Sequence, residues 1–254
     1  KLKIKKIDKS IKNIIYNRET FNSNKYYCLE CKTGWHYPKI PKIVLNNYYE
    51  SFYWLNRCEK EQVFDFSLNK VPNRERLKNI IDQFTFINRL SLNYKSIIDF
   101  GSGDCAGGYY FKKIIGIEDV SIFDLSKASR KIAKNYGLEI INSLGLKKVD
   151  LIYSSHSIEH VSNLESSLTK LKSTLNPNGY IFFEVPNISS IEVFYAMPHT
   201  PHTYMFSINS FKKIAQNFGF KIIAYEFIGP QWKRSFKGVK DNSKTDLRIC
   251  LQKI

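Results

Sequence analysis

The sequence predicts an α/β fold in which a mostly parallel sheet of seven strands carries helices on both faces. Three observations support this prediction. From about residue 73 onward, short apolar runs alternate with segments whose apolar residues follow helical spacing. A glycine-rich stretch, DFGSGD, ends the first apolar run at residues 99–104. The last two strand-like runs have no helix pattern between them, so one of them is expected to be antiparallel.

The elements follow in order along the chain. The first helix is expected at residues 74–90, where Leu77, Ile80, Phe84 and Ile87 share one face. Ser207 is a suitable N-cap for the last helix. The expected strands cover residues 95–100, 120–126, 138–142, 149–156, 180–187, 221–229 and 246–254, and the other helices cover 109–116, 127–137, 163–179 and 207–220.

Two parts of the chain differ in composition. Residues 1–66 are expected to form an N-terminal appendage, and residues 67–254 the main α/β domain. Within the appendage, residues 1–24 are rich in lysine and asparagine and are interpreted as a helical or loose arm. Residues 25–66 contain a CxxC pair, two prolines and a dense aromatic run.

The chain has a formal net charge of +16, which raises the question of nucleic-acid binding. Lysine rather than arginine dominates, and it is spread along the whole chain. Arginine would be expected at base edges and phosphates. We therefore expect no specific nucleic-acid partner. The basic stretch at 232–244 is read as a solvated loop, or as a rim for an anionic substrate.

Other sequence features bear on the compartment. The sequence has no apolar run of 18 residues and no convincing signal peptide, which favours a cytoplasmic protein without a membrane span. Five scattered cysteines do not form a disulfide framework. The oligomeric state stays open, with a homodimer as one option.

The glycine-rich stretch predicts a cofactor site. In a parallel sheet, ligands bind beyond the carboxyl ends of the strands. Gly101 and Gly103 let a ligand approach the backbone. Asp124 ends the second strand, where its carboxylate can accept hydrogen bonds from both hydroxyls of a ribose. These features imply a nucleoside cofactor. The spelling GSGDCAGG departs from the GxGxxG of dinucleotide sites, and a carboxylate at Asp99 suits a cofactor that carries an amino group and a sulfonium.

At these residues the chain resembles the class I S-adenosylmethionine-dependent methyltransferases, over roughly residues 74–254. DFGSGD is similar to their first motif, FDLS to their ribose-binding acid, and VDLIYSSHSIEHV to their fourth-strand motif. LKSTLNPNGYIFFEVPN is similar to their following helix, turn and fifth strand. The resemblance implies a Rossmann-like fold and S-adenosyl-L-methionine as cofactor, with S-adenosyl-L-homocysteine as product. One departure is Cys105, which stands where the family usually has a third glycine.

The resemblance also implies a set of cofactor-binding residues. Asn142 or Ser143, after the third strand, is expected to reach the adenine. The full set is Asp99, Gly101, Ser102, Gly103, Asp124, Leu125, Asn142, Ser143 and Ser155.

Four of the five histidines lie in two short stretches, HSIEH (156–160) and HTPH (199–202). The first follows the fourth strand, and the second lies where this fold usually builds its substrate site. Imidazole is a suitable general base near neutral pH. Related sugar methyltransferases use two such histidines, which implies His160 and His202, with His156 as a third catalytic candidate. The family's acid before the second histidine is Pro201 here.

Two groups of residues are possible metal sites, and neither is favoured. By resemblance to metal-dependent methyltransferases, His156, Glu159, His160 and His202 could bind a divalent ion. In the appendage, Cys28, Cys31, His36 and Cys58 could form a zinc site, although an incomplete or vestigial site is the preferred interpretation. The aromatic residues Tyr48, Tyr49, Phe52, Tyr53 and Trp54 are read either as a lid over the cofactor or as core packing.

The sequence therefore predicts a methyltransferase that acts on a small polar acceptor. A sugar, a sugar nucleotide or another carbohydrate group is favoured, and the basic surface would suit a phosphorylated molecule. One alternative is an RNA or protein methyltransferase, supported by charge alone. A second is a non-catalytic module that binds the cofactor, and a third, weaker one is an NAD-dependent enzyme.

Overall fold

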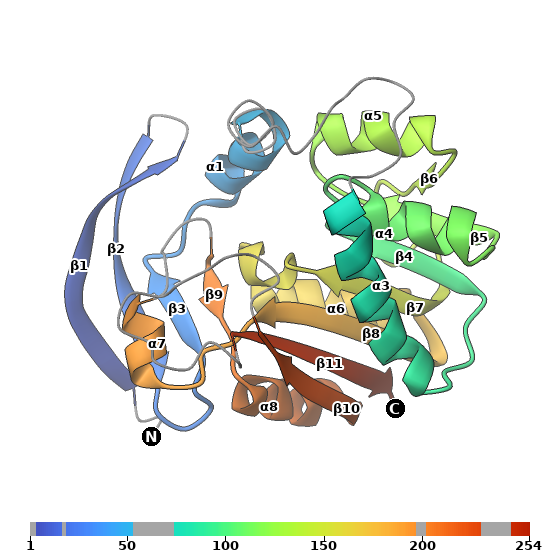
Figure 1. The fold of residues 1–254 in the computed structure, drawn as a ribbon. Helices are drawn as coiled ribbons and strands as arrows, with labels where there is room; N and C mark the ends of the chain where they lie inside the picture. Colours follow the sequence, from blue (N-terminus) through green and yellow to red (C-terminus); the bar gives the residue numbers. More distant parts are fainter. Residues whose placement is uncertain (1–3, 17–18, 53–73, 197–201, 230–244) are drawn as a thin grey trace.

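The computed structural model describes residues 4–16, 19–52, 74–196, 202–229 and 245–254. In these residues the strands form two sheets, a large one and a smaller one that contains the N-terminal strands (Figure 1). Side chains of residues 4–23, 51–52, 74–75 and 195–196 are not described.

The large sheet has seven strands in the order β10-β11-β8-β7-β4-β5-β6. The strands β4 to β8 pair in parallel, and β11 is antiparallel to both β8 and β10. The expected antiparallel strand is thus the last one of the chain. The bounds are β4 (Ser96–Phe100), β5 (Asp119–Phe123), β6 (Glu139–Ile140), β7 (Val149–Ser155), β8 (Leu175–Pro186), β10 (Phe220–Ile228) and β11 (Asp246–Lys253).

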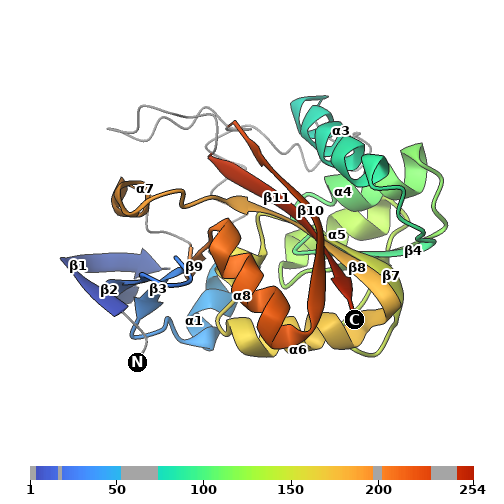
Figure 2. The ribbon, with the colours of Figure 1, turned by 90° about the horizontal axis from the view of Figure 1, so that it is seen from below.

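Helices cover both faces of this sheet, as the sequence predicts (Figure 2). The helices α3 and α4 lie on one side, and α6 and α8 on the other. Ser207 caps α8 with a capping box to Ser210. The bounds are α3 (Arg74–Arg89), α4 (Ala106–Tyr109) continued by the π-helical turn η2 (Tyr110–Ile114), α5 (Lys127–Asn135), α6 (Leu164–Thr174), α7 (Ile191–Ala196) and α8 (Ile208–Phe218).

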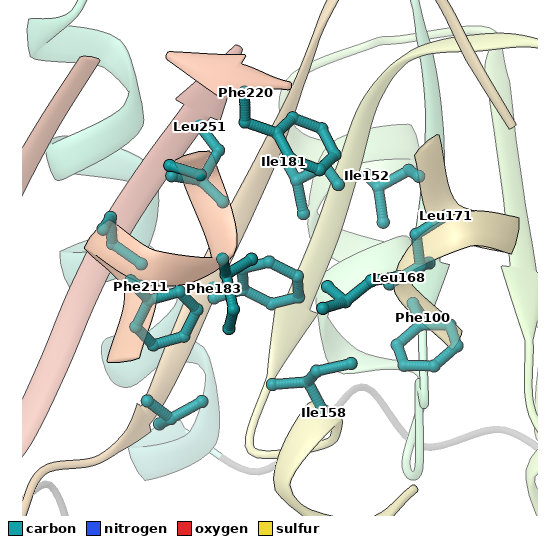
Figure 3. Packing of buried hydrophobic residues seen from close by; sticks show 14 of the residues in the cluster. Phe100, Ile152, Ile158, Leu168, Leu171, Ile181, Phe183, Phe211, Phe220 and Leu251 are labelled. Atoms are coloured by element: carbon teal, nitrogen blue, oxygen red, sulfur yellow. The ribbon is translucent and has the colours of Figure 1, made fainter. Parts of the chain in front are cut away.

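Strand periodicity divides the core into two clusters. In β8, Phe183 packs with α6 and α8, whereas the neighbouring Phe182 packs with α3 on the other face. Neighbouring residues of a strand point to opposite faces, so a strand that is apolar on both faces needs a helix layer on each. Figure 3 shows the first cluster, in which Leu168 and Leu171 of α6 meet Ile152, Ile181 and Phe183 of the sheet.

The smaller sheet corrects the prediction for residues 1–24. These residues do not form a helical or loose arm, because β1 (Ile4–Tyr16) pairs antiparallel with β2 (Glu19–Cys28). The repeated isoleucines of β1 favour a strand, and the pairing with β2 satisfies its backbone groups. β2 pairs with β3 (Gly34–Tyr37), and β3 pairs with β9 (Tyr204–Met205). Along the chain, β3 is followed by α1 (Lys42–Asn47) and then by η1 (Tyr48–Phe52).

The pairing of β3 with β9 joins the appendage to the main domain. The proposed boundary between residues 66 and 67 lies outside the described residues. β9 follows the segment that contains His202, so this pairing brings the N-terminal sheet to the histidines.

One helix is shorter than predicted. The expected helix 163–179 ends at Thr174, and β8 begins at the next residue. Residues 176–179 bulge out opposite Asp150, because Val149 pairs with Leu175 while Leu151 pairs with Tyr180. The Asp150 carboxylate accepts hydrogen bonds from the Ser96 backbone N–H and from the Asn176 side chain, which fixes this turn.

In the part of the chain that the structure describes, the helices are too short or too polar to cross a membrane.

Candidate active site

The loop after β4 brings bare backbone to the carboxyl edge of the sheet. Gly101 and Gly103 have φ values of 69° and 57°, in the left-handed region where glycine is favoured. A Cβ on Gly101 would lie 2.3 Å from the Ser157 Oγ, so no side chain fits there. The Gly101 N–H donates to the Phe123 carbonyl at 2.8 Å, which ties the loop to the end of β5.

Asp124 follows β5 directly and faces this loop. It is 8% exposed. Its Oδ2 accepts the Gly103 N–H at 2.8 Å, and its Oδ1 accepts the Ser126 N–H at 2.7 Å. Burial raises the pKa of its carboxyl. A carboxylate has about four acceptor positions, so acceptor capacity remains beside these two bonds and the Ser129 side chain. The residue therefore fits a ribose diol while it also shapes the loop.

Asp99, inside β4, is buried and faces α4. Its Oδ2 accepts the Gly108 N–H at 2.8 Å, and burial raises its pKa to about 7. A Cβ on Gly107 would lie 2.9 Å from the same oxygen. The two late glycines of GSGDCAGG therefore let α4 pack closely against Asp99.

Cys105 occupies a position that favours glycine. Its φ is 58°, and it is the residue that precedes α4. The side chain is fully buried, and its thiol donates to the Ser129 carbonyl at 3.3 Å. Burial raises the pKa of the thiol, so the group stays protonated. The departure from the family's glycine is thus accommodated by a small side chain that packs toward α5, at the cost of a left-handed backbone.

Two of the predicted cofactor residues turn their hydroxyls into the protein. Ser102 Oγ lies 3.1 Å from Ser129 Oγ, at the N-terminal turn of α5. Ser155 Oγ accepts a hydrogen bond from Gln83 Nε2 at 2.9 Å. A cofactor would meet the backbone of these residues rather than their hydroxyl groups.

The remaining three predicted cofactor residues lie beyond β5 and β6. Leu125 is 39% exposed. Asn142 and Ser143 are exposed in the loop after β6, and Asn142 Oδ1 accepts a hydrogen bond from Arg130 of α5 at 2.8 Å. An exposed apolar side chain beside exposed amide and hydroxyl groups is compatible with an adenine ring at this edge.

The structure brings His160 and His202 together. His160 ends the short helix η3 (Ile158–His160), and its ring centroid lies 4.9 Å from that of His202. The buried Glu159 joins them: one donor atom from each of these three residues lies within 4.8 Å of the others. Burial raises the pKa of Glu159, but the charges of His160 and His156 outweigh it and lower the pKa to about 2.

Tyr49 is the part of the aromatic run that reaches this cluster. Its ring centroid lies 5.7 Å from that of His160. The turn η1, to which Tyr49 belongs, also contacts α5, whose Ser129 lies next to Ser102 of the loop after β4. Tyr49 also packs against the buried cluster of Ile40, Val44 and Leu45, so its placement agrees with both interpretations, the lid and the core packing. Tyr53 and Trp54 lie outside the described residues.

His156 lies between two buried carboxylates. Its Nε2 is 3.2 Å from Glu184 Oε1, and its Nδ1 is 3.5 Å from Glu159 Oε1. Burial disfavours the charged ring, but these two carboxylates outweigh it and raise the pKa of His156 to about 9. A ring that is protonated at neutral pH cannot accept a proton, which argues against His156 as the general base.

This raised pKa predicts how stability depends on pH. A pKa of about 9 in the folded state, against 6.5 for the unperturbed group, stabilises the protein by about 3 kcal/mol below pH 6.5. The contribution is lost as pH rises through 9. We expect the free energy of unfolding, measured with urea, to fall by about 3 kcal/mol more between pH 6 and 9.5 in the wild type than in His156→Gln. Equal losses would show that His156 is not held as a cation.

Several residues of this region were missed in the sequence. Gln83 and Glu184 form a buried pair, in which Gln83 Nε2 donates to Glu184 Oε1 at 2.8 Å. Both left a signal: Glu184 is a charge inside the apolar run YIFFEVP, and Gln83 lies on the apolar face of α3. Ser157 left none, because only the fold shows that it faces Gly101.

The cysteines of the appendage lie apart from the histidine cluster. Cys28 and Cys31 are free thiols, and the Cys31 N–H donates to Cys28 Sγ at 3.4 Å. Cys58 lies outside the described residues. Among the described residues, the group of three or more side chains arranged for a metal ion is Glu159, His160 and His202, without either cysteine or His36.

Comparison with known proteins identifies the family. A family model described as "Methyltransferase domain" matches residues 72–225. The chain therefore belongs to this family, and it is a class I methyltransferase that uses S-adenosyl-L-methionine as methyl donor. A search of curated proteins finds no match to this chain.

Solved structures share the fold at low sequence identity. A protein proposed to be a sarcosine dimethylglycine methyltransferase from Galdieria sulphuraria is 11% identical, with a TM-score of 0.60, and the match covers 79% of this chain and 97% of that one. A SAM-dependent methyltransferase from Archaeoglobus fulgidus is 18% identical, with a TM-score of 0.55 over 80% and 100% of the two chains. A proposed methyltransferase from Haloferax volcanii, solved with the Trm112 methyltransferase activator, is 14% identical, with a TM-score of 0.53 over 70% and 94%.

Proposed function

We propose that the protein methylates a hydroxyl group of a small polar acceptor, such as a sugar, a sugar nucleotide or a glycan-linked group, with His160 or His202 as general base. The observation that carries this proposal is the pair of imidazole rings 4.9 Å apart at the carboxyl edge of the sheet. Imidazole can take the hydroxyl proton at neutral pH while the oxygen attacks the methyl carbon.

The cofactor is assigned to the loop after β4 and to the tips of β5 and β6. The carboxylate of Asp124 would hold the ribose hydroxyls, and the backbone at Gly101 and Gly103 would hold the methionine portion. Leu125 and Asn142 would hold the adenine. When bound, S-adenosyl-L-methionine supplies an electrophilic methyl group on a cationic sulfur, and S-adenosyl-L-homocysteine is the product.

The protein's own residues then position the acceptor. Holding the hydroxyl oxygen in line with the methyl group supplies much of the rate enhancement in a direct displacement. The Tyr49 ring lies 5.7 Å from the His160 ring, and in this proposal it limits the access of water to His160. One neutral histidine removes the proton, and the buried Glu159 stabilises the imidazolium that forms.

A small cavity of about 10 Å³, enough for about one water molecule, lies beside the histidine pair. Its lining includes His36 and Lys39 from the appendage, and Ser162 and Thr203 from the segments next to His160 and His202. The Thr203 carbonyl accepts the His36 N–H at 3.3 Å, which holds the two walls together. Lys39 is exposed and can offer its ammonium group to a phosphate or carboxylate.

The test is a mass-shift screen in which sugars, nucleotide sugars and their phosphates are incubated with S-adenosyl-L-methionine. With an acceptor found, His160→Ala or His202→Ala is expected to lower kcat about 10²- to 10⁴-fold, because a general base contributes that much. The cofactor Kd should stay within about 2-fold of the wild type by calorimetry. Lys170→Ala, on the exposed surface of α6, is the control.

Other outcomes would point to the alternatives. Loss of cofactor binding in both histidine variants would contradict the base assignment. Activity that is lost with EDTA and restored by a divalent ion would make the histidines metal ligands. Methylation of RNA or protein substrates only, in keeping with the net charge of +16, would replace the small acceptor. A requirement for an added activator protein, as the Haloferax volcanii complex suggests, would place the active form in a heterodimer.

A further inference from the structure

A line of buried charged groups runs from the sheet to the histidine pair. It begins at Arg248 of β11, passes through Glu184 of β8 and His156 after β7, and reaches Glu159 beside His160. Glu184 and Glu159 are 0% and 1% exposed, respectively. Charges this deeply buried are costly unless they are paired, so the line calls for a reason beyond packing.

We propose that His156 is a positioning residue: its ring lies between Glu184 and Glu159 and fixes the Glu159 carboxylate, which in turn sets the orientation and tautomer of the His160 ring. This inference rests on the proposed function, in which His160 or His202 is the base.

The first step concerns Glu184, whose two carboxylate oxygens both accept hydrogen bonds. Its Oε1 accepts a hydrogen bond from Gln83 Nε2 at 2.8 Å, and its Oε2 accepts one from Arg248 Nε at 2.6 Å. Arg248 also donates to Glu226 Oε1 at 3.1 Å. With partners on both oxygens, Glu184 is a fixed anchor inside the sheet.

The second step is that His156 is held on that anchor through backbone and side chain. Its N–H donates to the Glu184 carbonyl at 2.8 Å, and its φ is 51°, an unusual value for a residue with a side chain. Strained backbone of this kind tends to occur at functional sites. Both ring nitrogens face carboxylates, Nε2 at 3.2 Å from Glu184 and Nδ1 at 3.5 Å from Glu159.

The third step connects Glu159 with both catalytic candidates. Its Oε1 lies 3.7 Å from His160 Nε2. Its backbone carbonyl accepts the Thr203 N–H at 2.9 Å and the Thr203 hydroxyl at 2.8 Å, directly after His202. At 3.7 Å the contact between Glu159 and His160 is electrostatic and is not a hydrogen bond, and the negative charge facing Nε2 favours the His160 tautomer with the proton on Nε2.

The proposal can be tested without knowing the acceptor. The chain has five histidines, so their ring nitrogens can be followed by ¹⁵N NMR in the protein saturated with S-adenosyl-L-methionine. At pH 7.5 we expect a single His160 tautomer with the proton on Nε2. In His156→Gln the His160 signals should shift to those of mixed tautomers, while the His36 signals stay unchanged. Mixed His160 tautomers in the wild type, or His160 signals unaltered in His156→Gln, would overturn the proposal.

A mutant cycle adds a kinetic readout once an acceptor is found. His156→Gln is expected to lower kcat at least about 10-fold, as loss of a supporting carboxylate–histidine contact does elsewhere, with the cofactor Kd within about 2-fold. The double variant with Glu159→Gln should be no slower than Glu159→Gln alone, because both act through one carboxylate. If the kcat losses of the two single variants add up in the double variant, the proposal that both residues act through the Glu159 carboxylate is contradicted.

The failure of the proposed function can be distinguished. If His160→Ala and His202→Ala keep full turnover while the His160 NMR signals still respond to His156→Gln, the base assignment fails and the link from His156 to His160 remains. If the His156 variants do not fold, the wild-type spectrum is the test, because mixed His160 tautomers in it would overturn the proposal.

Discussion

Asp124→Ala is expected to weaken the binding of S-adenosyl-L-methionine by at least about 100-fold. Two hydrogen bonds from ribose hydroxyls to a carboxylate contribute roughly 1.5–3 kcal/mol each, and every 1.4 kcal/mol is a factor of ten in Kd. The same carboxylate accepts the N–H groups of Gly103 and Ser126, so its removal also loosens the glycine loop. Isothermal titration calorimetry with the cofactor measures the change.

Two further variants separate the contributions of Asp124. Asp124→Asn keeps the size of the side chain and one acceptor oxygen, so its affinity should fall between those of the wild type and Asp124→Ala. Asp119→Ala removes an acid from the other end of β5, where Asp119 pairs with Lys147. It should bind the cofactor as the wild type does. If Asp124→Ala binds within a few-fold of the wild type, the ribose assignment is wrong.

Gly101→Ala is expected to lower stability by about 2–4 kcal/mol and to abolish measurable cofactor binding. A left-handed φ costs a residue with a side chain about 1 kcal/mol, and the new methyl group would meet Ser157 Oγ at 2.3 Å and Cβ at 2.5 Å. Overpacking of this kind costs about 1–3 kcal/mol more. Urea unfolding measures the stability, and calorimetry measures the binding.

Two variants isolate the steric term at Gly101. Gly116 also has a positive φ, of 83°, but a Cβ there would meet no atom within 4 Å. Gly116→Ala should therefore cost only about 1 kcal/mol and leave cofactor binding intact. Adding Ser157→Gly to Gly101→Ala removes the atoms in the way and should recover most of the lost stability. Equal losses for Gly101→Ala and Gly116→Ala would contradict the close contact with Ser157.

The sequence was sufficient for the main sheet, for a physical reason. The strands β4, β7 and β8 are buried on both faces, and β4, β5 and β7 are each followed by a helix, so local patterns imply a covered parallel sheet. That one of the last two strands is antiparallel follows from the absence of a helix pattern in the sequence between them. Asp99, Gly101 and Asp124 could be placed at the carboxyl edge because strand ends are easily read.

The rest depends on contacts between distant segments. The hairpin β1–β2 was missed because frequent lysine and asparagine hide its strand pattern, and only the pairing in space shows it. The two-residue strand β9 is too short to predict, yet it joins the N-terminal sheet to the histidines. The sequence does not show that the Glu184 carboxylate, 28 residues further on, lies 3.2 Å from His156 Nε2.

The most direct test of the account is a crystal structure of the protein grown with S-adenosyl-L-homocysteine. We expect ribose hydroxyls within hydrogen-bond distance of the Asp124 carboxylate, the backbone at Gly101 and Gly103 against the amino-acid portion, and the sulfur facing His160 and His202. A ligand bound without contact to Asp124, or with its sulfur turned away from the histidine pair, would contradict it.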